Sequence, residues 1–168
     1  MVCSTIREIL VNTEKDYGGE DAVRYKIKKD VIESKTYTQL KNDSESFSRV
    51  LVSLGEQGNH VAVIGMTSYP WLVAYLGTVN SGSAAVPLDV SLPSEEVCEL
   101  LDRADVSVLV ADEVRKDVLA IAREKCPKLK YIISMQKEKG DQQSLALGQL
   151  LEENRGSFSY EPKPEDLC

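Results

Sequence analysis

The chain has 168 residues, and its 27 acidic and 20 basic side chains leave a formal net charge of −7 at pH 7. Apolar residues make up 42% of the sequence and charged residues 28%, which is typical of a globular protein with a buried core and excludes the disordered and fibrous classes. The acidic balance disfavours nucleic acids and anionic membranes as partners. The densest basic cluster, Lys26, Lys28 and Lys29, has strand spacing, and we interpret it as the solvent face of a strand.

The sequence offers no targeting segment and no metal-ligand pattern. The start of the chain carries Glu8 and lacks the long apolar run of a secretory signal. The most apolar stretch, residues 71–79, is far shorter than the ~20 residues that cross a bilayer. His60 is the only histidine and no two cysteines form a CxxC pair, so we expect no metal site. We expect a cytoplasmic protein with reduced cysteines, which are Cys3, Cys98, Cys126 and Cys168.

The first part of the chain combines helix and hairpin patterns. Residues 2–12 have the apolar spacing of a short amphipathic helix. Residues 22–37 alternate apolar and polar side chains around a Lys-Lys-Asp turn, which predicts a β-hairpin. Thr36 and Gln39 have the spacing of a capping box, which begins a helix that ends by Gly55.

A repeated alternation of short apolar runs and helical patterns follows. The expected strands are 60–65, 84–88, 106–111 and 130–134, and the expected helices between them are 68–80, 93–104 and 113–125. Apolar strands with helices on both sides are typical of a parallel sheet with two covered faces. We therefore predict an α/β fold: a doubly wound, mostly parallel sheet with helices on both faces, preceded by an N-terminal β-hairpin and helix.

Three further expectations concern individual elements. The helix at 68–80 is apolar nearly all round, so we expect it and its Trp71 to be mostly buried. Residues 145–154 have the pattern of a short helix, and residues 155–168 are expected to form an extended tail that adds no core element. The strand at 130–134 is left with an open edge, which sheets normally cover or pair.

Two loops next to predicted strands are candidate ligand sites. The chain has neither the Walker phosphate-binding pattern nor the dinucleotide fingerprint. The loop 55–58 carries Glu56 where a phosphate would need positive charge, so we interpret it as a helix-to-strand connection. The turn 65–68 leaves a strand and enters a helix, where open α/β folds bind ligands. The alternative is that Ser68 only caps that helix, with Pro70 in the first turn.

Acidic residues gather between 78 and 97 without forming a catalytic set. Glu95 and Glu96 are adjacent and diverge around a helix, and their place at its start suits the helix dipole. Asp89 follows a strand end, where its carboxylate can accept loop amides. No triad can be assembled around His60. From the residues alone we predict no catalytic, cofactor-binding or metal-binding residue in this chain.

Three stretches resemble the N-terminal region of the adenylate-forming superfamily, the AMP-dependent acyl-CoA synthetases and ligases. They are residues 35–55 with Thr-Tyr-x-x-Leu, residues 58–89 ending in Pro-Leu-Asp, and residues 91–113. The resemblance implies that residues 1–168 are part of the N-terminal subdomain, and that the 78–97 stretch is a structural turn. Residues 163–168 resemble the family's lead-in to a loop, rich in serine, threonine and glycine and ending in Pro-Lys-Gly, that holds the ATP phosphates. The tail 155–168 is thus expected to lead to a loop that this sequence does not contain.

Within the superfamily, the segment Pro-Leu-Asp-Val-Ser-Leu-Pro-Ser-Glu-Glu-Val at 87–97 is most similar to bacterial long-chain fatty-acid–CoA ligases. The resemblance implies a complete enzyme that uses ATP and magnesium to activate a carboxylic acid, here a fatty acid, and transfers the acyl group to coenzyme A. The rest of its chain would pack on this subdomain, which alone is expected to be inactive and to bind none of these cofactors. Two alternatives stay open: an amino-acid-activating domain, whose usual Asp-Pro-x-Tyr-Pro is absent here, and a stand-alone flavodoxin-like binding module.

Overall fold

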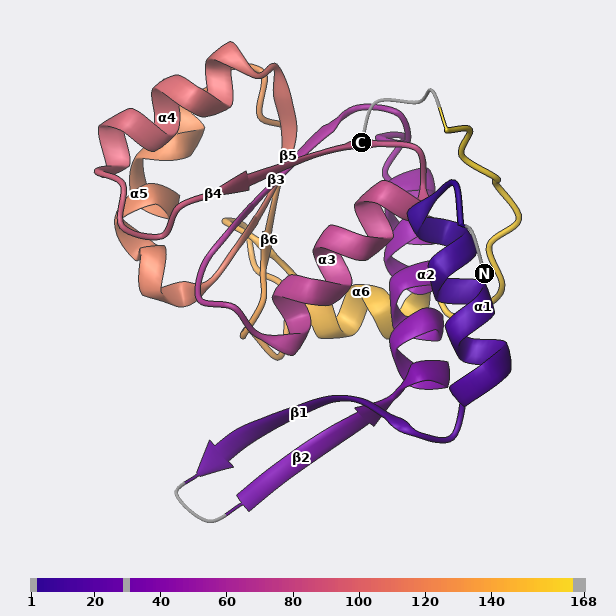
Figure 1. Ribbon diagram of the computed structural model, residues 1–168. Helices are drawn as coiled ribbons and strands as arrows, with labels where there is room; N and C mark the ends of the chain where they lie inside the picture. Colours follow the sequence, from indigo (N-terminus) through magenta and orange to yellow (C-terminus); the bar gives the residue numbers. More distant parts are fainter. Residues whose placement is uncertain (1–2, 29–30, 165–168) are drawn as a thin grey trace.

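A computed structural model describes residues 3–28 and 31–164, apart from the side chains of Ile27 and Lys28 (Figure 1). Lys29 and Asp30 of the predicted Lys-Lys-Asp turn lie outside the described residues, and so does Cys168. The helices are α1 (Ile6–Tyr17), α2 (Tyr37–Ser53), α3 (Tyr69–Asn80), α4 (Ser94–Arg103), α5 (Lys116–Lys125) and α6 (Leu147–Glu153), with a 3-10 turn at Glu113–Arg115. The strands are β1 (Asp21–Lys28), β2 (Val31–Thr36), β3 (His60–Ile64), β4 (Ala84–Leu88), β5 (Val106–Ala111), β6 (Tyr131–Ser134) and β7 (Leu145–Ala146).

The central sheet has the order β4-β3-β5-β6-β7, and all its strand pairs are parallel. Figure 1 shows α4 and α5 on one face of the sheet and α2, α3 and α6 on the other. The winding reverses after β4, because β5 pairs with the opposite side of β3. The predicted doubly wound α/β fold is confirmed.

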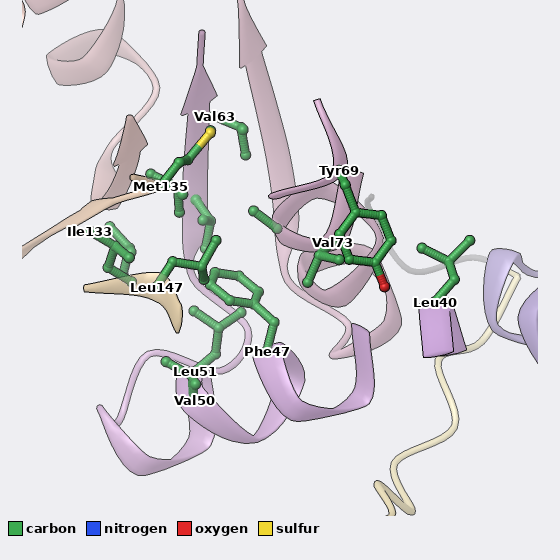
Figure 2. Packing of buried hydrophobic residues seen from close by; sticks show 14 of the residues in the cluster. Leu40, Phe47, Val50, Leu51, Val63, Tyr69, Val73, Ile133, Met135 and Leu147 are labelled. Carbon is green, nitrogen blue, oxygen red and sulfur yellow. The ribbon is translucent and has the colours of Figure 1, made fainter. Parts of the chain in front are cut away.

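The first face of the sheet packs against α2, α3 and α6. Val61, Val63, Val108 and Val110, alternate residues of the two central strands, point into this cluster and are fully buried. Figure 2 shows side chains of α2, Phe47 among them, reaching into it toward α6. Among the residues that the structure describes, fifteen buried side chains form this core, which is larger than the core on the other face.

The second face packs against α4 and α5. The intervening residues of the same strands, Ala62, Ile64, Leu109 and Ala111, join a cluster with Val97, Cys98, Leu101, Val118, Ala122 and Cys126. Strands that bury both faces must be apolar at every position, which explains the unbroken apolar runs of the sequence. Burial raises the pKa of Cys98, and it raises the pKa of Cys126 to about 12, so both thiols stay protonated near neutral pH.

Helices α2 and α3 approach each other closely at Gly77. A Cβ atom there would lie 2.6 Å from the Ser44 carbonyl oxygen and 2.7 Å from the Phe47 Cβ. Ser48, fully buried on α2, donates a hydrogen bond of 2.8 Å to the Gly77 carbonyl oxygen. The glycine therefore lets two helix backbones touch and share a polar contact.

The hairpin β1–β2 is a separate antiparallel sheet, as predicted, and Figure 1 shows it projecting from the body of the molecule. Its attachment includes Tyr25, whose ring stacks on Tyr69 at 6.2 Å between centroids. The capping box of Thr36 and Gln39 is also confirmed, with both of its hydrogen bonds present.

Three element predictions need correction. Helix α1 runs from Ile6 to Tyr17, later than the predicted 2–12, because Thr5 caps its start. The edge of β6 is not left open, since β7 pairs with it at Ile133 and Ser134; the first two residues of the predicted helix 145–154 form this strand. The third correction concerns α3, which was predicted to be mostly buried: its buried residues lie mainly on one side.

On that helix Trp71 is only partly buried, and it stacks on Tyr75 with 5.4 Å between ring centroids. The apolar character of the helix therefore predicted more burial than the neighbouring elements supply. No helix within residues 3–28 and 31–164 combines the length and apolar character needed to span a bilayer.

Candidate functional site

The crevice that open α/β folds use for ligands lies between the carboxyl ends of β3 and β5, because the helices after these two strands cover opposite faces. Here the two strand ends are in contact. A Cβ atom on Gly65 would lie 2.3 Å from the Cβ of Asp112, and the Asp112 amide donates to the Ile64 carbonyl oxygen at 2.9 Å. The contact fills the crevice with backbone and the Asp112 side chain.

The turn 65–68 serves the helix that follows it. The Ser68 hydroxyl accepts a hydrogen bond from the Trp71 amide at 3.4 Å, and Pro70 lies in the first turn of α3. This is the capping alternative that the sequence raised.

The acidic residues of 78–97 have structural partners. Asp89 accepts hydrogen bonds from the amide and the hydroxyl of Ser91, each at 2.8 Å, and these bonds lower the pKa of its carboxyl group. Glu95, in the first turn of α4, pairs with Lys125 of α5, while Pro93 is the N-cap rather than the first helical residue. The predicted hydrogen bond from a loop amide to the Asp89 carboxylate is confirmed.

A buried arginine that the sequence did not reveal ties two of these loops together. Arg115 is 5% exposed, and its Nη1 donates to the Val90 carbonyl oxygen at 2.9 Å. Its other side forms a bidentate pair with Asp117 at 2.9 and 2.8 Å, which lowers the pKa of that carboxyl group. The loops after β4 and β5 therefore hold each other through this arginine.

The loop 55–58 is a helix-to-strand connection, as predicted. Its Glu56 is 2% exposed and accepts hydrogen bonds from Lys130 at 2.9 Å and Asn59 at 2.8 Å. Burial opposes ionisation of this carboxyl group, but these donors outweigh it and its pKa is lowered. His60 follows at the start of β3 and contacts the Ala104 carbonyl oxygen. Both residues lie at the amino end of the sheet, away from the loops just described.

Gly82, in the stretch 78–97, has a role that depends on the tail. Its φ of 74° lies in the left-handed region, and a Cβ atom there would be 2.5 Å from the Tyr160 ring. The tail residue Phe158 is 8% exposed and its ring lies 6.3 Å from that of Tyr160. Residues 155–164 form neither helix nor strand, as expected for an extended tail, but Phe158 and Tyr160 add to the packing.

The structure contains shallow hollows beside the tail and beside α5. One, of about 220 Å³, lies between the start of α1 and the tail; Ile6, Val79, Gly82 and Pro162 are among its lining residues. Another, of about 480 Å³, is lined by Lys116, Arg123 and Lys137 among others. Within the part of the chain that the structure describes, no cluster of histidine, cysteine, aspartate or glutamate has the makings of a metal site. The described residues thus form an α/β scaffold with the tail packed against it.

The sequence matches the family described as AMP-binding enzyme over residues 12–168. The chain belongs to this family. The matched residues include Gly82 and the tail, and in the structure Gly82 lies against Tyr160 of the tail.

Curated relatives come from ligases and synthetases. The D-alanine–D-alanyl carrier protein ligase of Listeria monocytogenes serovar 1/2a is 34% identical over 96 residues, which cover 56% of this chain and 18% of that protein. The PKS-NRPS hybrid synthetase ATPKS of Aspergillus niger is 31% identical over 80 residues, covering 47% of this chain and 4% of that protein. The matched part of this chain thus spans less than a fifth of the length of these two relatives.

Solved structures share its fold. The anthranilate CoA ligase AuaEII in complex with anthranoyl-AMP superposes with a TM-score of 0.83 at 19% identity, covering 98% of this chain and 30% of that chain. The Mycobacterium tuberculosis fatty acyl CoA synthetase superposes with a TM-score of 0.80 at 18% identity, covering 97% and 31%. At these identities the likeness establishes the arrangement of helices and strands alone.

Proposed function

We propose that this chain is part of the N-terminal subdomain of an adenylate-forming acid–thiol ligase. The family match over residues 12–168 carries the proposal. The complete enzyme uses ATP and magnesium to join a carboxylate to the α-phosphate, releases pyrophosphate, and passes the acyl group to a thiol. The likeness in fold to a ligase crystallised with anthranoyl-AMP is consistent with this role.

The residues of this chain support the reaction without taking part in it. Adenylation needs amides and cations aimed at the charge that develops on the phosphates, and a metal ion that neutralises it. We propose that a phosphate-binding loop beyond residue 168 supplies the amides and a lysine. The contribution of residues 3–28 and 31–164 is a packed α/β scaffold and an anchored tail from which that loop starts.

We further propose a fatty acid as the carboxylate and coenzyme A as the acceptor. The segment 87–97 supports this, because it resembles bacterial long-chain fatty-acid–CoA ligases. A second candidate is an amino acid delivered to a carrier protein, which the identity to the D-alanine–D-alanyl carrier protein ligase favours. The absence of Asp-Pro-x-Tyr-Pro after β4 favours the first candidate over the second.

Pyrophosphate exchange into ATP tests the proposal. The longer native protein should exchange with at least one carboxylic acid from a panel of medium- and long-chain fatty acids, anthranilate and D-alanine. The present chain should give no exchange above a no-protein blank, because it lacks the groups that hold the phosphates. Both proteins are prepared from a host without its own fatty-acid ligase.

The pattern of acids separates the two candidates. Exchange with fatty acids, followed by acyl transfer to coenzyme A, supports the fatty-acid ligase; exchange with D-alanine alone supports the carrier-protein ligase. A longer protein that is folded but exchanges with no acid on the panel contradicts the proposal and favours the binding-module alternative. Exchange by the present chain would show that the reacting site lies inside it.

A further inference from the structure

The tail is held by side chains from two helices, α1 and α2, and by the turn that follows α3. Arg7 of α1 donates from Nη2 to the Phe158 carbonyl oxygen at 2.6 Å, and Arg49 of α2 donates from Nε to the Asn154 carbonyl oxygen at 3.1 Å. The Tyr160 ring lies against Gly82, just after α3. Figure 1 shows the yellow tail running beside α1 and α2. The tail therefore leaves the scaffold along a defined path.

Arg7 is the most deeply placed of these anchors. Its side chain is 13% exposed, and its Nη1 lies 3.0 Å from the Asn80 Oδ1 and 3.7 Å from the Glu45 carboxylate. Asn80 is 1% exposed and donates in turn to the Ser48 hydroxyl of α2 at 2.8 Å. The guanidinium is thus fixed by α2 and α3 on one edge, and presents its other edge to the backbone of the tail.

Stability alone is a weak reason for this arrangement. Taking a charged pair out of water has a cost that its attraction often only matches, and an apolar substitute is frequently as stable. The planar fork of arginine instead defines direction, because its donors lie in fixed positions. Lys41 already pairs with Glu45 at 3.4 Å, so Arg7 is not needed to neutralise that carboxylate.

We infer that Arg7 is a positioning residue: it fixes where the tail leaves the scaffold, and thereby where the phosphate-binding loop begins. The inference rests on the proposed function. Phe158 and Cys168 are ten residues apart, so a fully extended chain carries Cys168, after which we expect the strand and the loop, at most about 36 Å from the anchor. A displacement of about 1 Å at a reacting centre can reduce a rate by about 100-fold, so a released tail should impair ATP use.

Release of the tail can be measured on the present chain by limited proteolysis with chymotrypsin. The sequence has two phenylalanines, Phe47 and Phe158. Cleavage after Phe158 reports tail release, whereas cleavage after the fully buried Phe47 reports global unfolding. Arg7→Met should raise cleavage at Phe158 about 10-fold relative to cleavage at Phe47. Lys41→Met is the matched control, because it also removes a cation from Glu45, while among the described residues the Lys41 ammonium hydrogen-bonds to that carboxylate and not to the tail. It should leave the ratio unchanged.

The kinetic arm uses the longer native protein. Arg7→Met should raise the KM for ATP in pyrophosphate exchange by about 10–100-fold and leave the KM for the acid within about twofold. Lys41→Met should resemble the parent. Arg7→Lys keeps a positive charge beside Glu45 but loses the fork, so it should give an intermediate KM for ATP.

The two arms separate the possible failures. If Arg7→Met and Lys41→Met give the same cleavage ratio, Arg7 does not hold the tail and the inference is wrong. If the tail is released but both KM values stay at those of the parent, the contact is only structural, which also overturns the positioning role. A parent that is inactive with every acid overturns the proposed function itself, and this outcome is visible before any variant is compared.

Discussion

Replacing Phe47 with alanine should lower the free energy of unfolding by ~3–5 kcal/mol. Phe47 is fully buried in the larger core, where α2 packs on the sheet and on α6 (Figure 2). Truncation removes the transfer free energy of the ring and leaves a cavity that the close contact of α2 with Gly77 prevents from collapsing. Urea denaturation followed by far-ultraviolet circular dichroism gives the value.

Trp71→Ala is the matched control for this prediction. Trp71 is the larger residue, but it is only partly buried at the margin of the same core. Its loss should therefore reduce the free energy of unfolding by roughly 1–3 kcal/mol, because less apolar area returns to water. A cost for Trp71→Ala equal to or above that for Phe47→Ala would contradict the packing described here.

Gly82→Ala should lower the free energy of unfolding by roughly 2–5 kcal/mol, from two sources. The left-handed backbone, with φ of 74°, disfavours a side chain by ~1–2 kcal/mol. The added Cβ would also lie 2.5 Å from the Tyr160 ring, and such overpacking typically costs ~1–3 kcal/mol. The same denaturation measurement applies.

Gly55→Ala separates these two sources. Gly55 has nearly the same φ, 71°, but an added Cβ there meets nothing within 4 Å. Its replacement should therefore carry only the backbone cost of ~1–2 kcal/mol. Adding Tyr160→Ala to Gly82→Ala should bring the effect of the glycine change down to the same range. Equal costs for the two single glycine variants would show that Tyr160 does not pack on Gly82.

The sheet was predictable because its signal is local. Every residue of β5, Val106–Ala111, is buried, and all of them except Ser107 are apolar, a pattern that is visible without knowledge of the neighbouring strands. The caps at Thr36 and Ser68 are likewise local, since each side chain accepts from an amide three residues on.

What the sequence did not reveal depends on contacts between distant residues. Arg7 donates a hydrogen bond to the carbonyl oxygen of Phe158, which is 151 positions away in the sequence. Arg115 donates to that of Val90, which is 25 positions away. The pairing of β7 with β6 adds the same kind of contact, because two residues are too few to show a strand pattern. Tertiary packing also left α3 less covered than its composition suggests.

The candidate site also combines local features that the sequence shows with contacts between distant residues that only the structure shows. The general rule on strand ends points to Gly65 as a ligand position, and only the structure shows that Asp112, just after the neighbouring strand β5, is in contact with it. Conversely, the sequence predicts an extended tail, and only the structure shows that its Phe158 is buried. Its importance follows from its anchorage rather than from any motif.

The most direct test of the proposed function is the native coding sequence downstream of codon 168. We expect a few apolar residues that form a strand, followed at once by a segment close to Thr-Ser-Gly-Thr-Thr-Gly-x-Pro-Lys-Gly, whose glycines let backbone amides approach the ATP phosphates. A stop codon at that point, or a long continuation without such a loop, would contradict the proposal that this chain leads into the ATP site of an adenylate-forming ligase.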